Sequence, residues 1–73
     1  MEEYSRILIE EYCEAHDTAK SRRLKKLVEM SYDLTTGGTD SDAYFLEKLI
    51  AQEKNPEFKA ALEELDEYLF GMW

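Results

Sequence analysis

The pair of residues in this 73-residue chain that comes nearest to a catalytic pattern is Cys13 and His16. Three positions apart, they would be neighbours on a helix, and a thiolate beside an imidazole is the start of a nucleophilic site. The sequence shows neither a third residue that would orient His16 nor a nearby Gly-rich loop for an oxyanion. We therefore predict that Cys13 lies at the edge of the core, that His16 lies at the surface, and that the protein is not an enzyme.

Metal and cofactor patterns are incomplete. Cys13 and His16 supply two ligands, whereas zinc needs three or four, and the chain has no second Cys or His. Asp40 and Asp42 follow Gly37-Gly38 as in some calcium loops, but the later ligands are missing and helix capping accounts for both aspartates. The glycine pair lacks the Lys-Ser/Thr ending of a P-loop and the third glycine of a dinucleotide-binding fingerprint. We expect neither a metal nor a cofactor.

Acidic residues dominate the chain, whose formal net charge is −8. Carboxylates four residues apart, such as Glu10/Glu14 and Glu63/Glu67, share one face of a helix, but acid–base catalysis also needs a pocket that perturbs a pKa. So short a chain rarely encloses such a pocket, whereas spaced negative charge on a helix can meet a basic surface. The carboxylates predicted to bind a partner are Glu63, Glu64, Asp66, Glu67, Glu10 and Glu14.

Basic residues are concentrated in one segment, Lys20–Lys26. Residues 18–28 carry a charge of +5, whereas residues 1–17 carry −5. Pairing with neighbouring acids of the fold, Glu10, Glu14 and Asp17 among them, is the expected role of this segment, and an acidic protein or a nucleic acid is the alternative partner. The negative charge elsewhere would repel a phosphate backbone, so nucleic acid is disfavoured. The basic patch consists of Lys20, Arg22, Arg23, Lys25 and Lys26.

Several aromatic residues lie outside the expected apolar stripes. Tyr44 and Phe70 fall outside the stripes of their helices, Tyr68 lies at a stripe edge, and Trp73 is the last residue. Tyr and Trp are common anchors of protein interfaces, although such side chains can also complete a core. We predict that these four residues are apolar anchors for a partner.

Composition restricts the class of protein. The 44% of hydrophobic residues is typical of a folding chain rather than a disordered one. A single cysteine allows no internal disulfide, no apolar run approaches the roughly 20 residues of a membrane span, and the acidic N-terminal segment does not resemble a signal peptide. The expectation is one soluble domain over residues 1–73 in the cytoplasm, without membrane contact.

The fold class indicated by apolar periodicity is all-α, a small four-helix bundle with helices at about residues 2–16, 18–34, 40–54 and 56–70. The stripe expected to face inward from the first helix is Tyr4, Ile7, Leu8, Tyr12 and Ala15. The stripe of the second helix is Leu24, Leu27, Val28, Ser31 and Leu34. The stripe of the third is Phe45, Leu46, Leu49 and Ile50, and that of the fourth is Phe58, Ala61, Leu62, Leu65 and Leu69.

Neither Gly nor Pro separates the first two helices, so one long helix within a three-helix bundle is the alternative. On a straight helix the two apolar stripes would point roughly 140° apart, and one core cannot be served by both. We therefore predict a break near residues 16–19, with Asp17 or Thr18 as the N-cap.

Local signals mark the other helix ends. Gly37 suits a left-handed position after the second helix, and Thr39 opens the third with a Thr-x-x-Asp capping box. Asn55-Pro56 starts the fourth helix, and Gly71 ends it with Met72 folding back in a Schellman-type contact.

These features favour a small acidic protein-interaction module, an adaptor or inhibitor that binds a basic surface of a macromolecular partner. Its size and charge would suit a virus-encoded inhibitor of a host nucleic-acid enzyme. The alternative is a self-assembling, dimeric structural or regulatory subunit, because a short chain gains core by pairing. Nucleic-acid binding through Lys20–Lys26 is a third hypothesis, and hydrolysis by Cys13 and His16 is the last.

Overall fold

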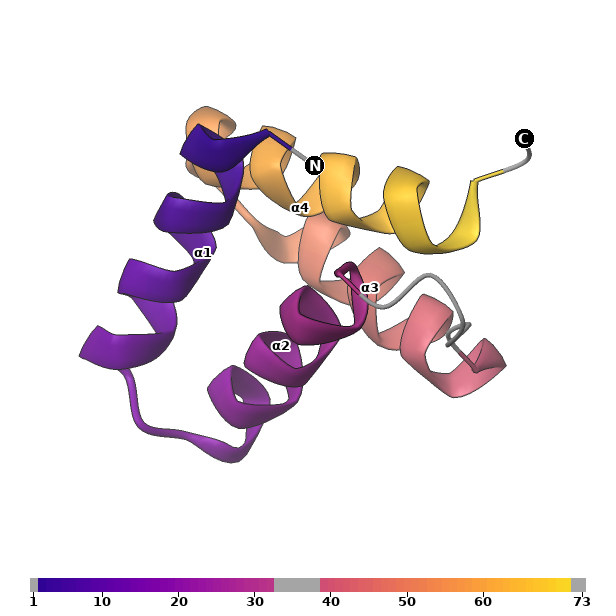
Figure 1. Cartoon of the computed structure of the whole chain (residues 1–73), viewed down its shortest axis with the longest axis horizontal. Helices are drawn as coiled ribbons and strands as arrows, with labels where there is room; N and C mark the ends of the chain where they lie inside the picture. The colour runs from indigo at the N-terminus through magenta and orange to yellow at the C-terminus, as the bar shows by residue number, and fades with distance from the viewer. Residues whose placement is uncertain (1, 33–38, 72–73) are drawn as a thin grey trace.

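The computed structural model describes residues 2–32 and 39–71, and these segments contain four α-helices and no strand (Figure 1). The helices are α1 (Glu3–Ala15), α2 (Ala19–Met30), α3 (Asp40–Gln52) and α4 (Pro56–Phe70). The radius of gyration is 11.2 Å, close to the value of about 11 Å for a compact chain of this length. The predicted all-α fold class is confirmed.

Helix α4 is the centre of the arrangement, because it packs against each of the other three helices. α1 and α2 form two arms that diverge from a short connection and also pack against each other (Figure 1). α3 packs mainly on α4, behind α2 in this view. α4 can serve all three because its buried residues recur every three or four positions and cover a wide face.

The predicted break between the first two helices is confirmed. His16 and Thr18 both have extended backbone, and the side chain of Thr18 accepts a hydrogen bond of 3.1 Å from the backbone N–H of Ser21. Thr18, rather than Asp17, is therefore the N-cap of α2. The change of direction lets both arms bury an apolar face in the same core.

Residues from all four helices form the core, and the predicted stripes of α2, α3 and α4 are confirmed for the residues that the structure describes. Leu34, predicted for α2, lies outside them. The buried apolar residues are Ile9, Cys13, Leu24, Leu27, Val28, Leu46, Leu49, Ala61, Leu62 and Leu65. Packed against them are Leu8, Tyr12, Met30, Phe45, Ile50, Phe58, Leu69 and Phe70.

The predicted inward face of α1 is wrong in part. Tyr4 is 60% exposed and Ile7 39% exposed, and Ala15 is exposed too, whereas Leu8 and Tyr12 pack partly on the core. The buried face consists of Ser5, Ile9 and Cys13. Two of these three side chains are small, so this face lets α1 lie close to its neighbours, and the larger Tyr4 and Ile7 turn outward.

Two helices end earlier than predicted. α2 stops at Met30, where the hydroxyl of Ser31 donates to the backbone oxygen of Val28 at 2.5 Å. The predicted glycine stop at Gly37-Gly38 lies outside the described residues. α3 stops at Gln52, because the carboxylate of Glu53 accepts hydrogen bonds from the next two backbone N–H groups and the chain there leads into a proline.

The predicted N-caps of α3 and α4 are confirmed. Thr39 and Asp42 form a reciprocal capping box, with the hydroxyl of Thr39 accepting from the N–H of Asp42 at 3.2 Å. The side-chain oxygen of Asn55 accepts from the N–H groups of Glu57 and Phe58, and Pro56 occupies the first helical position. These two caps fix where the second pair of helices begins.

The end of α4 differs from the Schellman prediction. Gly71 is not left-handed; it has φ −66° and ψ 152°, and its N–H donates to the backbone oxygen of Glu67 at 2.8 Å. Glycine is still required, since a Cβ at this position would overlap that oxygen. Met72 lies outside the described residues.

Candidate functional site

Cys13 and His16 do not form a nucleophilic pair. Cys13 is buried, and burial raises the pKa of its thiol, with Glu10 adding to the rise and Lys25 partly opposing it. His16 is exposed and stacks on Tyr12 with 4.4 Å between ring centroids, and its Nδ1 lies 3.0 Å from the backbone oxygen of that tyrosine. No hydrogen bond joins Cys13 to His16 in the structure, so the imidazole is not placed to accept the proton of the buried thiol.

A shallow pocket lies where ends of the four helices meet. Its volume is about 290 Å³, open solvent at the mouth included, and its lining residues are Tyr12, Lys20, Leu24, Leu49, Gln52, Glu53, Phe58 and Leu62. Tyr12 and Phe58 form an aromatic wall with 4.7 Å between ring centroids. The carboxylate of Glu53 is already bonded to backbone N–H groups. The lining therefore combines apolar side chains with the polar side chains of Lys20, Gln52 and Glu53.

Within residues 2–32 and 39–71, no three potential metal ligands of the His, Cys, Asp or Glu type come together. Asp42, one of the two aspartates weighed as calcium ligands, is engaged with Thr39 and Arg23. Burial raises the pKa of Asp42, but the hydrogen bonds from these two residues outweigh it and hold the pKa below its usual value. None of the helices in these segments is both long enough and apolar enough to cross a bilayer.

The arginines of the basic patch form ion pairs with acids of the same chain, as predicted. Arg22 contacts Asp17 at 2.8 Å, although both side chains are largely exposed. Arg23 contacts Asp42 at 3.1 Å, and its guanidinium lies over the ring of Phe45, 4.5 Å from the centroid. Arg23 thereby links α2 to the start of α3, a contact that the sequence analysis did not foresee.

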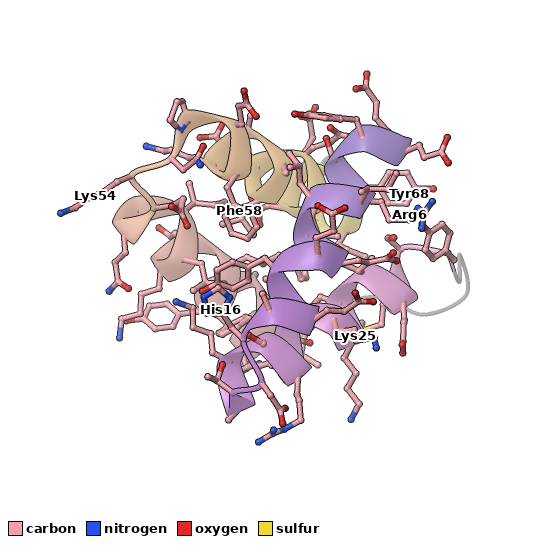
Figure 2. All side chains as sticks on the ribbon, turned by 90° about the vertical axis from the view of Figure 1, so that its left-hand side faces the viewer. Arg6, His16, Lys25, Lys54, Phe58 and Tyr68 are labelled. Atoms are coloured by element: carbon pink, nitrogen blue, oxygen red, sulfur yellow. The ribbon has the colours of Figure 1, made fainter. Side chains whose placement is uncertain are left out.

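The lysines of the basic patch are different. Lys20, Lys25 and Lys26 are exposed, and none is within ion-pair distance of an acid in the described segments. Of the predicted acidic neighbours, Glu10 pairs with Arg6 at 3.1 Å, and Glu14 makes no ion pair among the described residues. Figure 2 shows Lys25 beside the C-terminal end of α1.

The acids of α4 are divided among different surroundings. Glu64 accepts hydrogen bonds from the hydroxyl of Ser5, at 2.6 Å, and from the backbone N–H of Glu2. Burial raises the pKa of Glu64, but these bonds outweigh it and lower the pKa below its usual value. Burial, with the charge of Glu47, raises the pKa of Asp66.

Glu64 thus holds α1 against α4. The exposed residues among the predicted α4 acids are Glu63 and Glu67.

The outward side of α1 combines apolar and acidic residues. Tyr4, Ile7, Glu11 and Glu14 are all exposed, and the hydroxyl of Tyr4 donates to the carboxylate of Glu57 on α4 at 3.0 Å. The sequence analysis assigned Tyr4 and Ile7 to the core. A signal that could have corrected it is the run Ile7-Leu8-Ile9, because three consecutive helical residues span about 200° and cannot all face one core.

The predicted aromatic anchors occupy three kinds of position. Tyr44 is 63% exposed with the Lys48 ammonium 5.7 Å from its ring centroid, as expected for a residue outside the stripe. Phe70 packs on the core, so its predicted outward position is wrong. Tyr68 is half-buried, and Trp73 lies outside the described residues.

Comparison with known proteins gives no match: no family model fits the chain, and neither a curated protein nor a solved structure is significantly similar to it. The arrangement of the described side chains is therefore the basis for assigning a role.

Proposed function

We propose that this protein is a small, acidic, non-enzymatic interaction module, an adaptor or inhibitor that binds a basic surface of a macromolecular partner. The observation that carries the proposal is the exposure of two carboxylates on α4, those of Glu63 and Glu67, which make no ion pair among the described residues. Four ion pairs occur in the described segments, and none of them uses an acid of α4. Glu63 and Glu67 lie one turn apart on that helix with both carboxylates in solvent.

The described residues support binding rather than chemistry. Cys13 is buried with a raised thiol pKa, and His16 is stacked on Tyr12 away from it. By contrast, exposed acids on α4 and α1 make a negative field that speeds encounter with a basic partner and weakens as salt is added. A nucleic-acid enzyme, whose phosphate-binding surface is basic, is the partner class that we propose, and a virus is the source that such an inhibitor would suit.

Titration with a fluorescent oligolysine peptide, followed by anisotropy at low and high salt, tests the proposal. We expect salt-sensitive binding that falls in Glu63→Lys and in Glu67→Lys. Glu29→Lys is the matched control, because it makes the same charge change at an exposed acid of α2. Equal weakening by all three variants, which would reflect net charge alone, would contradict the proposal, as would no binding by the natural protein at low salt.

Self-assembly is the second candidate, favoured by the exposure of large apolar side chains. Tyr4, Tyr32 and Tyr44 are each at least 60% exposed. Sedimentation equilibrium at low and high salt separates the two functions, because apolar pairing persists at high salt whereas charge-driven binding does not.

A further inference from the structure

We infer that the outer face of α1, defined as Tyr4, Ile7, Glu11 and Glu14, is the docking site for a basic amphipathic helix of the partner protein. The inference rests on the proposed function, since it takes the basic partner from there and adds its secondary structure and a further place of contact, on α1.

Helix geometry brings the four residues together. Ser5, Ile9 and Cys13 define the buried direction of α1. At 100° per residue, the four residues of the outer face fall within roughly 80° of one another on the opposite side. Figure 2 looks onto α1 from this outer side, where the helix crosses in front of α4. The face is therefore one continuous strip about two to three turns long.

The N-terminal half of the strip leaves apolar surface in solvent. Ile7 is 39% exposed, and a β-branched residue at a helix surface lowers helix propensity relative to Glu or Lys. Tyr4 is 60% exposed, while its hydroxyl donates a hydrogen bond to Glu57. A side chain already held in place loses little freedom on binding, so Tyr4 is a preorganised contact.

The C-terminal half of the strip is acidic, and this selects the occupant. Glu11 and Glu14 follow the apolar pair along the same face, and the one base of α1, Arg6, is paired with Glu3 and Glu10. A complementary helix needs apolar residues opposite Tyr4 and Ile7 and cations opposite the two glutamates. A second copy of α1 would bring carboxylates to carboxylates in a parallel pair and carboxylates to apolar side chains in an antiparallel pair, and neither arrangement supplies a cation for Glu11 and Glu14.

Two labelled peptides of equal positive charge test the inference by anisotropy. One is an amphipathic Leu/Lys helix of about 18 residues, and the other is oligolysine. We expect the natural protein to bind the amphipathic peptide roughly tenfold more tightly than oligolysine, because burial of the exposed part of Ile7 contributes about a factor of ten in affinity. Ile7→Ser should remove this advantage and leave oligolysine binding unchanged, and Glu11→Lys should weaken both peptides.

Tyr32→Ser is the control, since it also removes an exposed apolar side chain but lies outside α1 and outside the predicted anchors. Circular dichroism tests whether each variant is folded. If Ile7→Ser does not fold, Ile7→Gln replaces it. Unchanged binding of the amphipathic peptide by both would overturn the inference while oligolysine binding upholds the proposed function. A dimer that Ile7→Ser dissociates would also overturn it, in favour of a second copy. Binding of neither peptide would overturn both proposals.

Discussion

Two isoleucines of α1, two positions apart, provide a direct test of the helix orientation. Ile9 is fully buried at 0% exposure, whereas Ile7 is 39% exposed. The sequence stripe assigns Ile7 to the core and omits Ile9, while the structure gives the reverse order. Replacing each by alanine therefore makes the same chemical change at two positions whose surroundings differ.

The expected free-energy losses follow from burial. Ile9→Ala removes three buried carbons, worth about 0.8 kcal/mol each, and leaves part of a cavity, so the free energy of unfolding should fall by about 3 kcal/mol. At Ile7, about three-fifths of the same surface is buried, and alanine gains about 0.4 kcal/mol of helix propensity. The net loss at Ile7 is then about 1 kcal/mol.

Urea unfolding and thermal unfolding, both monitored by circular dichroism, measure the loss of stability in each variant. For a domain of this size, Ile9→Ala should lower Tm by roughly 15 °C and Ile7→Ala by roughly 5 °C. The denaturant slope should stay the same in both variants, because the fold is unchanged. If Ile7→Ala costs as much as Ile9→Ala or more, the assignment of the buried face of α1 is wrong, and with it the outer face proposed as a docking site.

Four further predictions concern one helix cap, two carboxylates and the thiol. Thr18→Ala should lower the free energy of unfolding by about 1 kcal/mol, and Thr18→Ser should not, as urea titration can measure. Because the pKa of Glu64 is lowered in the fold, its ionised carboxylate stabilises the protein at pH values above the unfolded-state pKa of about 4.3. Glu64→Gln should therefore lower the free energy of unfolding by about 1 kcal/mol at neutral pH, and by progressively less as acid protonates the native carboxylate. The raised pKa of Asp66 means that its charge is disfavoured in the fold; Asp66→Asn should therefore raise Tm at neutral pH, with the gain lost below about pH 4. Cys13 should react slowly with a thiol reagent until urea unfolds the chain, and fast reaction in the native state would restore the Cys13–His16 hypothesis.

The division of the α4 acids limits which of them can bind a partner. Glu64 is bonded to Ser5 and to the backbone of Glu2, so its replacement would change the packing of α1 as well as the surface charge. Glu63 and Glu67 make no such contacts. Experiments on the acidic surface are therefore best made at Glu63 and Glu67, where a loss of binding does not also report a loss of fold.

Local chemistry made much of the fold predictable from the sequence. Thr18, Thr39 and Asn55 cap helices because a short side-chain oxygen can reach backbone N–H groups two or three residues ahead, whatever the rest of the chain does. The stripe of Leu62 and Leu65 in α4 was clear because only one face of that helix is apolar. The break after α1 was predictable from the mismatch in direction of the two apolar stripes.

Tertiary packing decided what periodicity left ambiguous. α1 has apolar residues on two faces, and its residues favour a helix equally well whichever of these faces is buried. Ser5 and Cys13 lie in the interior because their small side chains allow α1 to approach α2 and α4 closely. This orientation leaves Ile7 39% exposed. The partners of Glu64 and Arg23 lie 59 and 19 residues away along the chain, at Ser5 and Asp42. The sequence therefore determined the four helices and three of their N-caps, whereas only the packed structure determined which carboxylates hold the fold and which remain exposed.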